Sequence, residues 1–270
     1  MDRANSFGDY LKARRRLITP EQAGILRGSR RRVSGLRREE VALLAGISPE
    51  YYLRLEQGRD HNPSDGVLDA LAAVLQLDDQ GSAYLHRLAR TPPGGRAPTE
   101  VEDVPAGVAQ VIDELPVPTF VQGRWMDVLA ANPLARALSP QYRPGVNVLR
   151  AVFLEPADRI LHQDWERATA EAVSGLRASA GVDLDDPRLV DLVGELSAAS
   201  QRFRHLWERQ DVRQKVGGTS RFLHPVVGEL ELRHEKFLVT GRQGQVLVMY
   251  HAAPGSPSHD ALLRMTAVGS

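Results

Sequence analysis

The chain has 270 residues, of which 42% are hydrophobic, and its 34 cationic and 34 anionic side chains give a formal net charge of zero. This length permits one large core or two modest ones and favours two domains. The absence of cysteine excludes disulfides, thiolate zinc sites, iron–sulfur clusters and cysteine nucleophiles. The sequence has no apolar run of ~20 residues and no signal-peptide pattern, which predicts a cytoplasmic protein without membrane contact.

Five short helices are predicted in the first 90 residues. The first runs from Phe7 to Arg16, where apolar side chains recur at helical spacing. Serine or aspartate caps and terminal glycines mark most of the others. These four are predicted at residues 38–46, 48–58, 64–77 and 78–90.

A basic segment, "RGSRRRVSGLRR" at residues 27–38, follows the first predicted helix. Arginine alone is a weak signal, because all but three of the chain's cations are arginine. The position of the charge is more informative: residues 1–38 carry eleven cations and three anions, so they hold a net charge of +8 and the rest holds −8. This asymmetry indicates a segment that meets a polyanion, with a solvated surface as the alternative.

The second and third predicted helices have the pattern of a helix-turn-helix. A turn of a few residues joins them, and Gly46 follows Ala42 by four positions. Ala42 must be small where the second helix crosses it, and Gly46 supplies the tight turn. A plain helical hairpin needs neither residue at this spacing, so the pattern favours DNA binding.

The second half begins after "TPPGGRAP" at residues 91–98, where proline and glycine exclude regular structure. It contains all three tryptophans and five of the six phenylalanines. Alternating apolar residues predict a hairpin about Gly123-Arg124, then helices, then three final strands joined by glycine-containing turns. Strands, helices and strands in this order predict an α+β fold with helices on one side of an antiparallel sheet.

With these motifs the chain resembles the Xre-type helix-turn-helix regulators and, more closely, the MmyB-like transcription regulators. The resemblance is carried by "RRVSGLRREEVALLAGISPEYYLRLEQGRD", "FVQGRWMDVLAANPLARAL", "DPRLVDLVGELSAASQRFRHLW" and "GELELRHEKF". It implies a multidomain protein. An all-α five-helix helix-turn-helix domain would occupy residues 1–90, a Pro/Gly-rich linker residues 91–104, and an α+β PAS-like ligand-binding and dimerisation domain with an antiparallel sheet residues 105–270.

The resemblance makes residues 49–57 the recognition helix, lying in the major groove of a double-stranded DNA operator. On it, Arg54 is expected to bind a guanine and Glu50 a cytosine amino group, whereas Tyr52 is expected in the core. Glu56 is expected to pair with Arg14 of the first helix. The arginines before and after this helix are expected at phosphates. The predicted DNA-binding residues are Arg30, Arg31, Arg32, Arg37, Arg38, Ser48, Pro49, Glu50, Tyr51, Arg54 and Arg59.

The resemblance also implies that the second half binds a small apolar ligand such as a fatty acid. Large apolar side chains spread over every predicted element of this half, as cavity-lining residues do, although a filled core has the same pattern. No catalytic residue, metal or cofactor is predicted. The predicted ligand-binding residues are Phe120, Trp125, Val128, Phe153, Trp165, Leu196, Phe203, Trp207, Phe222 and Phe237.

Three functions fit the sequence. The first is a ligand-responsive regulator that binds two DNA half-sites as a homodimer. In the second, the C-terminal half only dimerises or contacts another protein, and its core is filled. The third is an enzyme with an appended DNA-binding domain. Because the linker is flexible by composition, an effector is expected to act through the packing of two C-terminal domains.

Overall fold

The computed structural model describes residues 6–25, 33–60, 62–90, 102–181, 183–213, 216–242 and 244–268. Most of the basic segment, including Arg30, Arg31 and Arg32, lies outside the described residues, as does most of the predicted linker. The predictions made for those residues therefore rest on the sequence.

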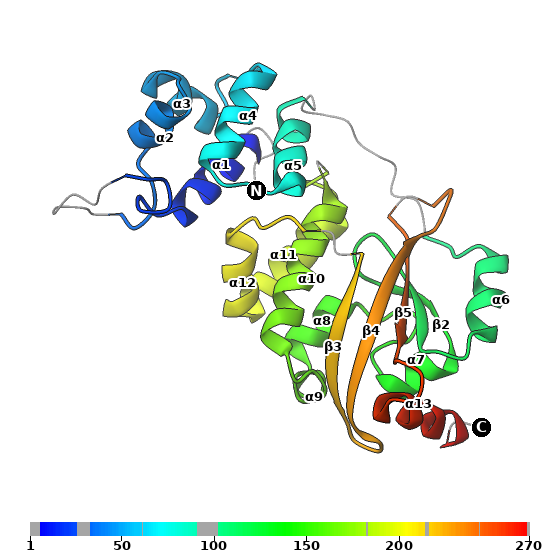
Figure 1. Cartoon of the computed structure of the whole chain (residues 1–270). Helices are drawn as coiled ribbons and strands as arrows, with labels where there is room; N and C mark the ends of the chain where they lie inside the picture. The colour runs from blue at the N-terminus through cyan, green and yellow to red at the C-terminus, as the bar shows by residue number, and fades with distance from the viewer. Residues whose placement is uncertain are drawn as a thin grey trace.

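The N-terminal domain is helical, and its five predicted helices are confirmed (Figure 1). Their buried faces form one core, in which Tyr10 and Leu11 of the first helix meet Val41, Tyr52 and Leu55 of the helix-turn-helix. The helices are α1 (Ser6–Leu17), α2 (Arg38–Leu44), α3 (Pro49–Glu56), α4 (Asp65–Val74) and α5 (Asp79–Arg90).

The turn between α2 and α3 has the predicted construction. Ala42 is fully buried, and its carbonyl accepts a hydrogen bond of 3.0 Å from the Ile47 amide. Gly46 has a φ of +68°, in the left-handed region that a residue with a Cβ rarely adopts. The Ser48 hydroxyl caps α3 by accepting a hydrogen bond of 3.1 Å from the Tyr51 amide.

The C-terminal domain contains a five-stranded antiparallel sheet, which confirms the predicted α+β fold (Figure 1). Its strand order is β2-β1-β5-β4-β3, so the two ends of the domain's sequence pair at the centre, where β1 lies beside β5. The predicted hairpin about Gly123-Arg124 is formed by β1 and β2. The strands are β1 (Thr119–Gln122), β2 (Val128–Ala131), β3 (Gly217–His224), β4 (Gly228–Leu238) and β5 (Val246–His251).

One face of the sheet packs against three helices. Alternate strand residues, among them Phe120, Phe222, Leu232 and Val248, form a core with α7, α9 and α13. A second, helical core joins α8, α10, α11 and α12. The helices are α6 (Ala106–Glu114), α7 (Pro133–Leu138), α8 (Val148–Leu154), α9 (Pro156–Leu161), α10 (Trp165–Ala180), α11 (Pro187–Ala199), α12 (Gln201–Glu208) and α13 (Pro257–Val268).

The two domains also touch each other directly. Val212, in the segment after α12, is buried in the core of the N-terminal domain, and Arg14 of α1 forms an ion pair with Asp211. Figure 1 shows α2 and α3 on the side of the N-terminal domain that faces away from the C-terminal domain. Packed side chains therefore connect the two halves, in addition to the chain segment between them.

Candidate DNA-binding and ligand-binding sites

The outward face of α3 carries the predicted base-reading side chains. Pro49, Glu50 and Arg54 are exposed, and Tyr51 is partly exposed, whereas Tyr52 and Leu55 on the opposite face are buried. This confirms that Tyr52 belongs to the core. Pro49, Glu50 and Tyr51 lie in the first turn of the helix, the part that enters a major groove in this motif, and Arg54 follows on the same face one turn later.

Arg54 lies close to two neighbouring side chains, Tyr51 and Asp60. Its guanidinium lies 5.5 Å from the centre of the Tyr51 ring, and its Nε lies 3.9 Å from a carboxylate oxygen of Asp60. About half of the side chain remains exposed. Stacking on the ring leaves the guanidinium edge available for a bidentate contact with a base.

Glu56 fixes the recognition helix to the rest of the domain, through partners other than the one predicted. Its buried carboxylate accepts hydrogen bonds from Arg15 Nε at 2.7 Å and Arg38 Nε at 2.5 Å. The prediction of Arg14 as the partner is wrong by one residue, since Arg14 contacts Asp211. Burial opposes ionisation of Glu56, but the hydrogen bonds from Arg15 and Arg38 outweigh it and lower its pKa.

The arginines around the helix-turn-helix occupy exposed positions. Arg37 and Arg38 lie at the N-terminal end of α2, and Arg59 follows α3; all three are exposed. The Nε of Arg38 is bound to Glu56, so the direction of its guanidinium is fixed. Contact of these residues with DNA phosphates stays a prediction.

A cavity of about 540 Å³ lies between α10 and the sheet of the C-terminal domain. Glu171, Gly175 and Ser179, four residues apart on one face of α10, form one wall. The opposite wall comes from strands β1, β4 and β5, including Gln122, Lys236 and Val246. The volume falls in the range of roughly 300–1,000 Å³ that small-molecule sites occupy.

The lining of this cavity is partly apolar and partly charged. Met126, Val216, Leu238 and Val246 supply apolar surface, and Phe237, which is 53% exposed, lies beside them. Polar lining groups are contributed by Gln80, Gln122, Glu171, Ser179, Arg213 and Lys236. Such a site suits a mainly apolar molecule that carries a few polar groups.

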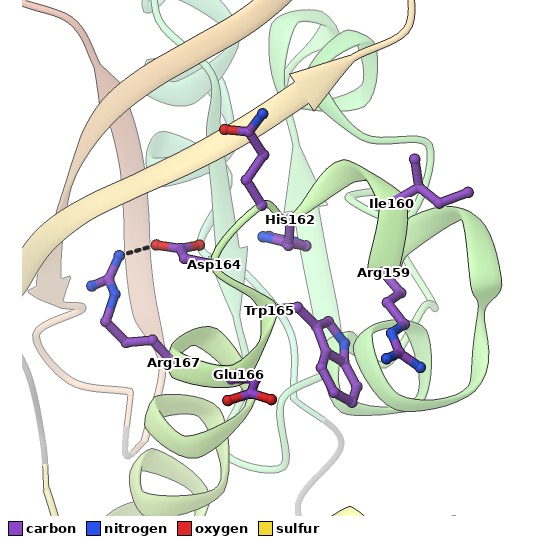
Figure 2. A pocket seen from close by; sticks show the side chains of 8 residues that line it. Arg159, Ile160, His162, Asp164, Trp165, Glu166 and Arg167 are labelled. Carbon is purple, nitrogen blue, oxygen red and sulfur yellow. Dashed lines mark hydrogen bonds and ion pairs between the residues drawn. The ribbon is translucent and has the colours of Figure 1, made fainter.

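A second, more open depression lies where α9, α10 and β3 meet (Figure 2). Trp165 is its largest lining side chain, and the guanidinium groups of Arg159 and Arg202 lie 4.6 and 5.0 Å from the ring. Asp164 and Arg167 form an ion pair at its edge, marked by the dashed line in Figure 2. Charged side chains line much of this open depression, so the cavity beside α10 is the better candidate for an apolar ligand.

His162, which lines this depression, and the nearby Asp158 are buried titratable groups. His162 Nε2 is 3.5 Å from Asp158 Oδ2, and the His162 ring packs against Phe222 at 4.9 Å between centres. Burial lowers the pKa of His162 to about 4. Burial, with the Glu155 carboxylate adding to its effect, raises the pKa of Asp158 to about 6. The pair is therefore largely uncharged at mildly acidic pH.

Comparison with known families identifies both domains. Residues 6–85 match the helix-turn-helix domain family, and residues 104–265 match the family described as the MmyB-like transcription regulator ligand binding domain. The second match covers more than half of the chain. The chain belongs to the MmyB-like transcription regulators. A search of curated proteins gives no match.

The family assignment confirms the predicted resemblance, and its two domains together support a ligand-responsive transcription regulator. The matched ligand-binding domain is a part of regulators rather than of enzymes. The described residues contain no cluster of three or more histidine, cysteine or acidic side chains suited to a metal ion. None of the described helices has the length and apolar character needed to cross a membrane.

In this MmyB-like domain the predicted ligand residues fall in several places. Phe237 lines the cavity beside α10, and Trp165 lines the second depression. Phe120, Val128 and Phe222 lie in the core of the sheet. The helical core contains or contacts the remaining five, which are Trp125, Phe153, Leu196, Phe203 and Trp207.

The cavity-lining residues of α10 were missed because sequence reasoning followed large aromatic side chains. A cavity needs small residues where the wall recedes, and Gly175 and Ser179 supply them four positions apart. Polar residues that repeat on the inner face of a helix were the available signal. Arg15, which holds Glu56, was missed for another reason, since Arg14 and Arg15 are adjacent cations of one helix end.

Proposed function

We propose that the chain regulates transcription by binding a specific DNA operator as a homodimer and a small, mainly apolar ligand in the cavity beside α10. The observation that carries this proposal is the pairing of an exposed, preorganised α3 face with a cavity of about 540 Å³ in one chain. A fatty acid is one molecule of the expected class. The ligand binds the C-terminal domain, and α3 reads the operator.

The DNA part of the proposal is supported by the construction of the helix-turn-helix. Glu56 ties α3 to α1 and α2, so the exposed side chains are presented on a rigid helix. One such unit covers too few base pairs for tight specific binding, and two copies on adjacent half-sites supply the rest. The basic segment before α2 adds phosphate contacts that do not depend on sequence.

The ligand part is favoured over a domain that serves only dimerisation or protein contact. That alternative predicts a filled core without a cavity, whereas a partly open cavity large enough for a small molecule lies between α10 and the sheet. A ligand that binds only the folded domain stabilises it, by an amount that grows with the logarithm of the ligand concentration divided by its Kd. The residues that line it offer apolar contact on the sheet side and polar contact at Lys236 and Arg213.

The Arg54→Ala variant is expected to lose about 1–3 kcal/mol of discrimination between operator and random DNA, because a bidentate arginine–guanine pair carries that much specificity. Its affinity for random DNA is expected to change little. Equilibrium binding of the full chain to both DNAs, at one fixed salt concentration, measures the two effects. An equal loss on both DNAs would assign Arg54 to a phosphate instead.

A triple variant, in which Arg30, Arg31 and Arg32 become Ala, is compared with Arg54→Ala to distinguish phosphate contacts from base contacts. It is expected to weaken binding to both DNAs and to reduce the slope of log affinity against log salt by about one for each phosphate that no longer meets an arginine. An unchanged slope would return this segment to the solvated-surface interpretation. The two variants therefore distinguish sequence-specific contacts with bases from sequence-independent contacts with phosphates.

Native mass spectrometry of the purified full chain tests the ligand part. The wild-type protein is expected to retain a small molecule that Gly175→Leu excludes, because the new side chain enters the cavity. A Cβ at Gly175 meets only Met126 Cε, at an ordinary 3.6 Å. Gly194→Leu on α11, where a Cβ meets nothing within 4 Å, is the control and should keep the molecule. Equal occupancy in all three proteins would place the ligand elsewhere.

A further inference from the structure

The cavity beside α10 is built by both domains. Most of its lining comes from the C-terminal domain, but Gln80 belongs to α5 of the DNA-binding domain. Arg213 lines the same cavity, and its Nε lies 3.7 Å from Asp78 Oδ2, at the start of α5. A molecule that fills this space therefore lies against the DNA-binding domain as well as the sheet.

Helix α10 is a wall shared between the cavity and the DNA-binding domain. Glu171, Gly175 and Ser179 line the cavity along one side. Ala178, on another side of the same helix, packs against the core of the N-terminal domain. A shift of α10 relative to the sheet would therefore alter the packing of the N-terminal core directly, and the linker need not transmit it.

Arg177 is the most constrained residue of this contact. It is 1% exposed, its guanidinium stacks 3.8 Å from the centre of the Trp207 ring, and its Nη2 donates to the Trp207 carbonyl at 2.9 Å. Burial lowers the pKa of Arg177, and the nearby Tyr84 and Tyr10 of the N-terminal domain act in the opposite direction. A buried cation depends closely on the geometry of these partners, so the contact is sensitive to small movements.

The segment after α12 completes the contact. Asp211 forms an ion pair with Arg14, and Val212 lies in the N-terminal core. The Arg213 amide lies 3.5 Å from the Ser174 carbonyl of α10. We call the contact made by Arg14, Tyr84, Arg177, Asp211 and Val212 the domain junction.

We propose that a ligand in the cavity contacts both domains at once, through Gln80 on one side and α10 on the other, and thereby strengthens the domain junction. The inference rests on the proposed ligand role of this cavity and adds the route by which the ligand acts. A ligand stabilises the arrangement to which it binds better. Because α3 faces away from the junction, occupancy sets the orientation of α3 without covering it (Figure 1).

Hydrogen exchange of the full chain tests the inference without DNA and without a known ligand. Gly175→Leu fills the space between α10 and the sheet, supports α10 and so strengthens the junction. The amides of α1 and α5 are expected to exchange about fivefold more slowly than in wild-type protein that has been refolded free of bound small molecules, at the low end of usual coupling between sites. Gly194→Leu, an exposed glycine-to-leucine change on α11, is expected to match the wild type.

A second variant checks that the junction carries the effect. Val212→Asp places a carboxylate in the N-terminal core and is expected to speed exchange in α1 and α5. On that background Gly175→Leu should no longer slow these helices, because coupled changes are not additive. Unchanged exchange in α1 and α5 of Gly175→Leu would overturn the inference, whether or not α10 itself is slowed. Native mass spectrometry tests the ligand role by itself, and its result would stand in either case, so the two proposals fail separately.

Discussion

Glu56→Ala is expected to lower the free energy of unfolding of the DNA-binding domain by about 3–5 kcal/mol, the usual effect of removing one partner of a buried ion pair. The Glu56 carboxylate is fully buried and accepts hydrogen bonds from Arg15 and Arg38. Arg15 is itself only 11% exposed, so the variant leaves a nearly buried cation without its carboxylate. Loss of α3 packing then removes specific DNA binding as well.

Urea unfolding followed by the circular dichroism of the helices measures this loss, with Glu50→Ala as the matched control. Glu50 lies on the same helix but is exposed, so its replacement should change stability by about 0.5 kcal/mol or less. Because the pKa of Glu56 is lowered, its contribution is present above its ordinary pKa and is lost as the pH falls through the folded-state value. Equal stability of the two variants would contradict the role assigned to Glu56.

The second large effect is expected from His162 and depends on pH. Burial lowers the pKa of His162 from 6.5 to about 4, so its contribution to stability is complete above 6.5 and is lost as the pH falls through 4. Asp158 has the opposite sign. Its pKa is raised from 3.8 to about 6, so its contribution is complete below 3.8 and is lost as the pH rises through 6. The two effects partly cancel in the wild-type protein.

Comparison of the wild type with His162→Gln isolates the histidine. The difference between their free energies of unfolding is expected to shift by about 3 kcal/mol, against the wild type, from about pH 7.5 to about pH 4. Asp158 is protonated over most of this range and therefore supplies no counter-charge to His162. Tryptophan fluorescence during urea unfolding reports on this domain, which contains all three tryptophans. A difference that stays constant with pH would show that His162 keeps its ordinary pKa.

Local patterns predicted the elements of the fold. Apolar spacing, the Ser48 cap and Gly46 fixed α2 and α3, because each acts within a few residues of chain. The hairpin about Gly123 and the three final strands followed from alternation and glycine-containing turns. These signals are local, so they can be interpreted without knowledge of the tertiary structure.

The contacts between distant segments were not predicted. Arg14 and Arg15 are neighbours that differ by about 100° around α1, and only the tertiary structure decides which one reaches Glu56. Arg177 gave no signal, since a buried arginine and an exposed one look the same in a sequence. Most of the aromatic residues predicted to bind a ligand lie in the two cores of the C-terminal domain. The position of the cavity depends instead on how α10 lies across the sheet.

Sequence-specific regulation through α3 can be tested by selecting bound sequences from a pool of random double-stranded DNA with the purified full chain. We expect one enriched motif with two half-sites about one helical turn apart, as a homodimer requires. We also expect Arg54→Ala to select the same motif with one base position relaxed. A bound pool with the composition of the starting pool, under conditions where the wild-type protein retains DNA, would contradict operator reading by α3.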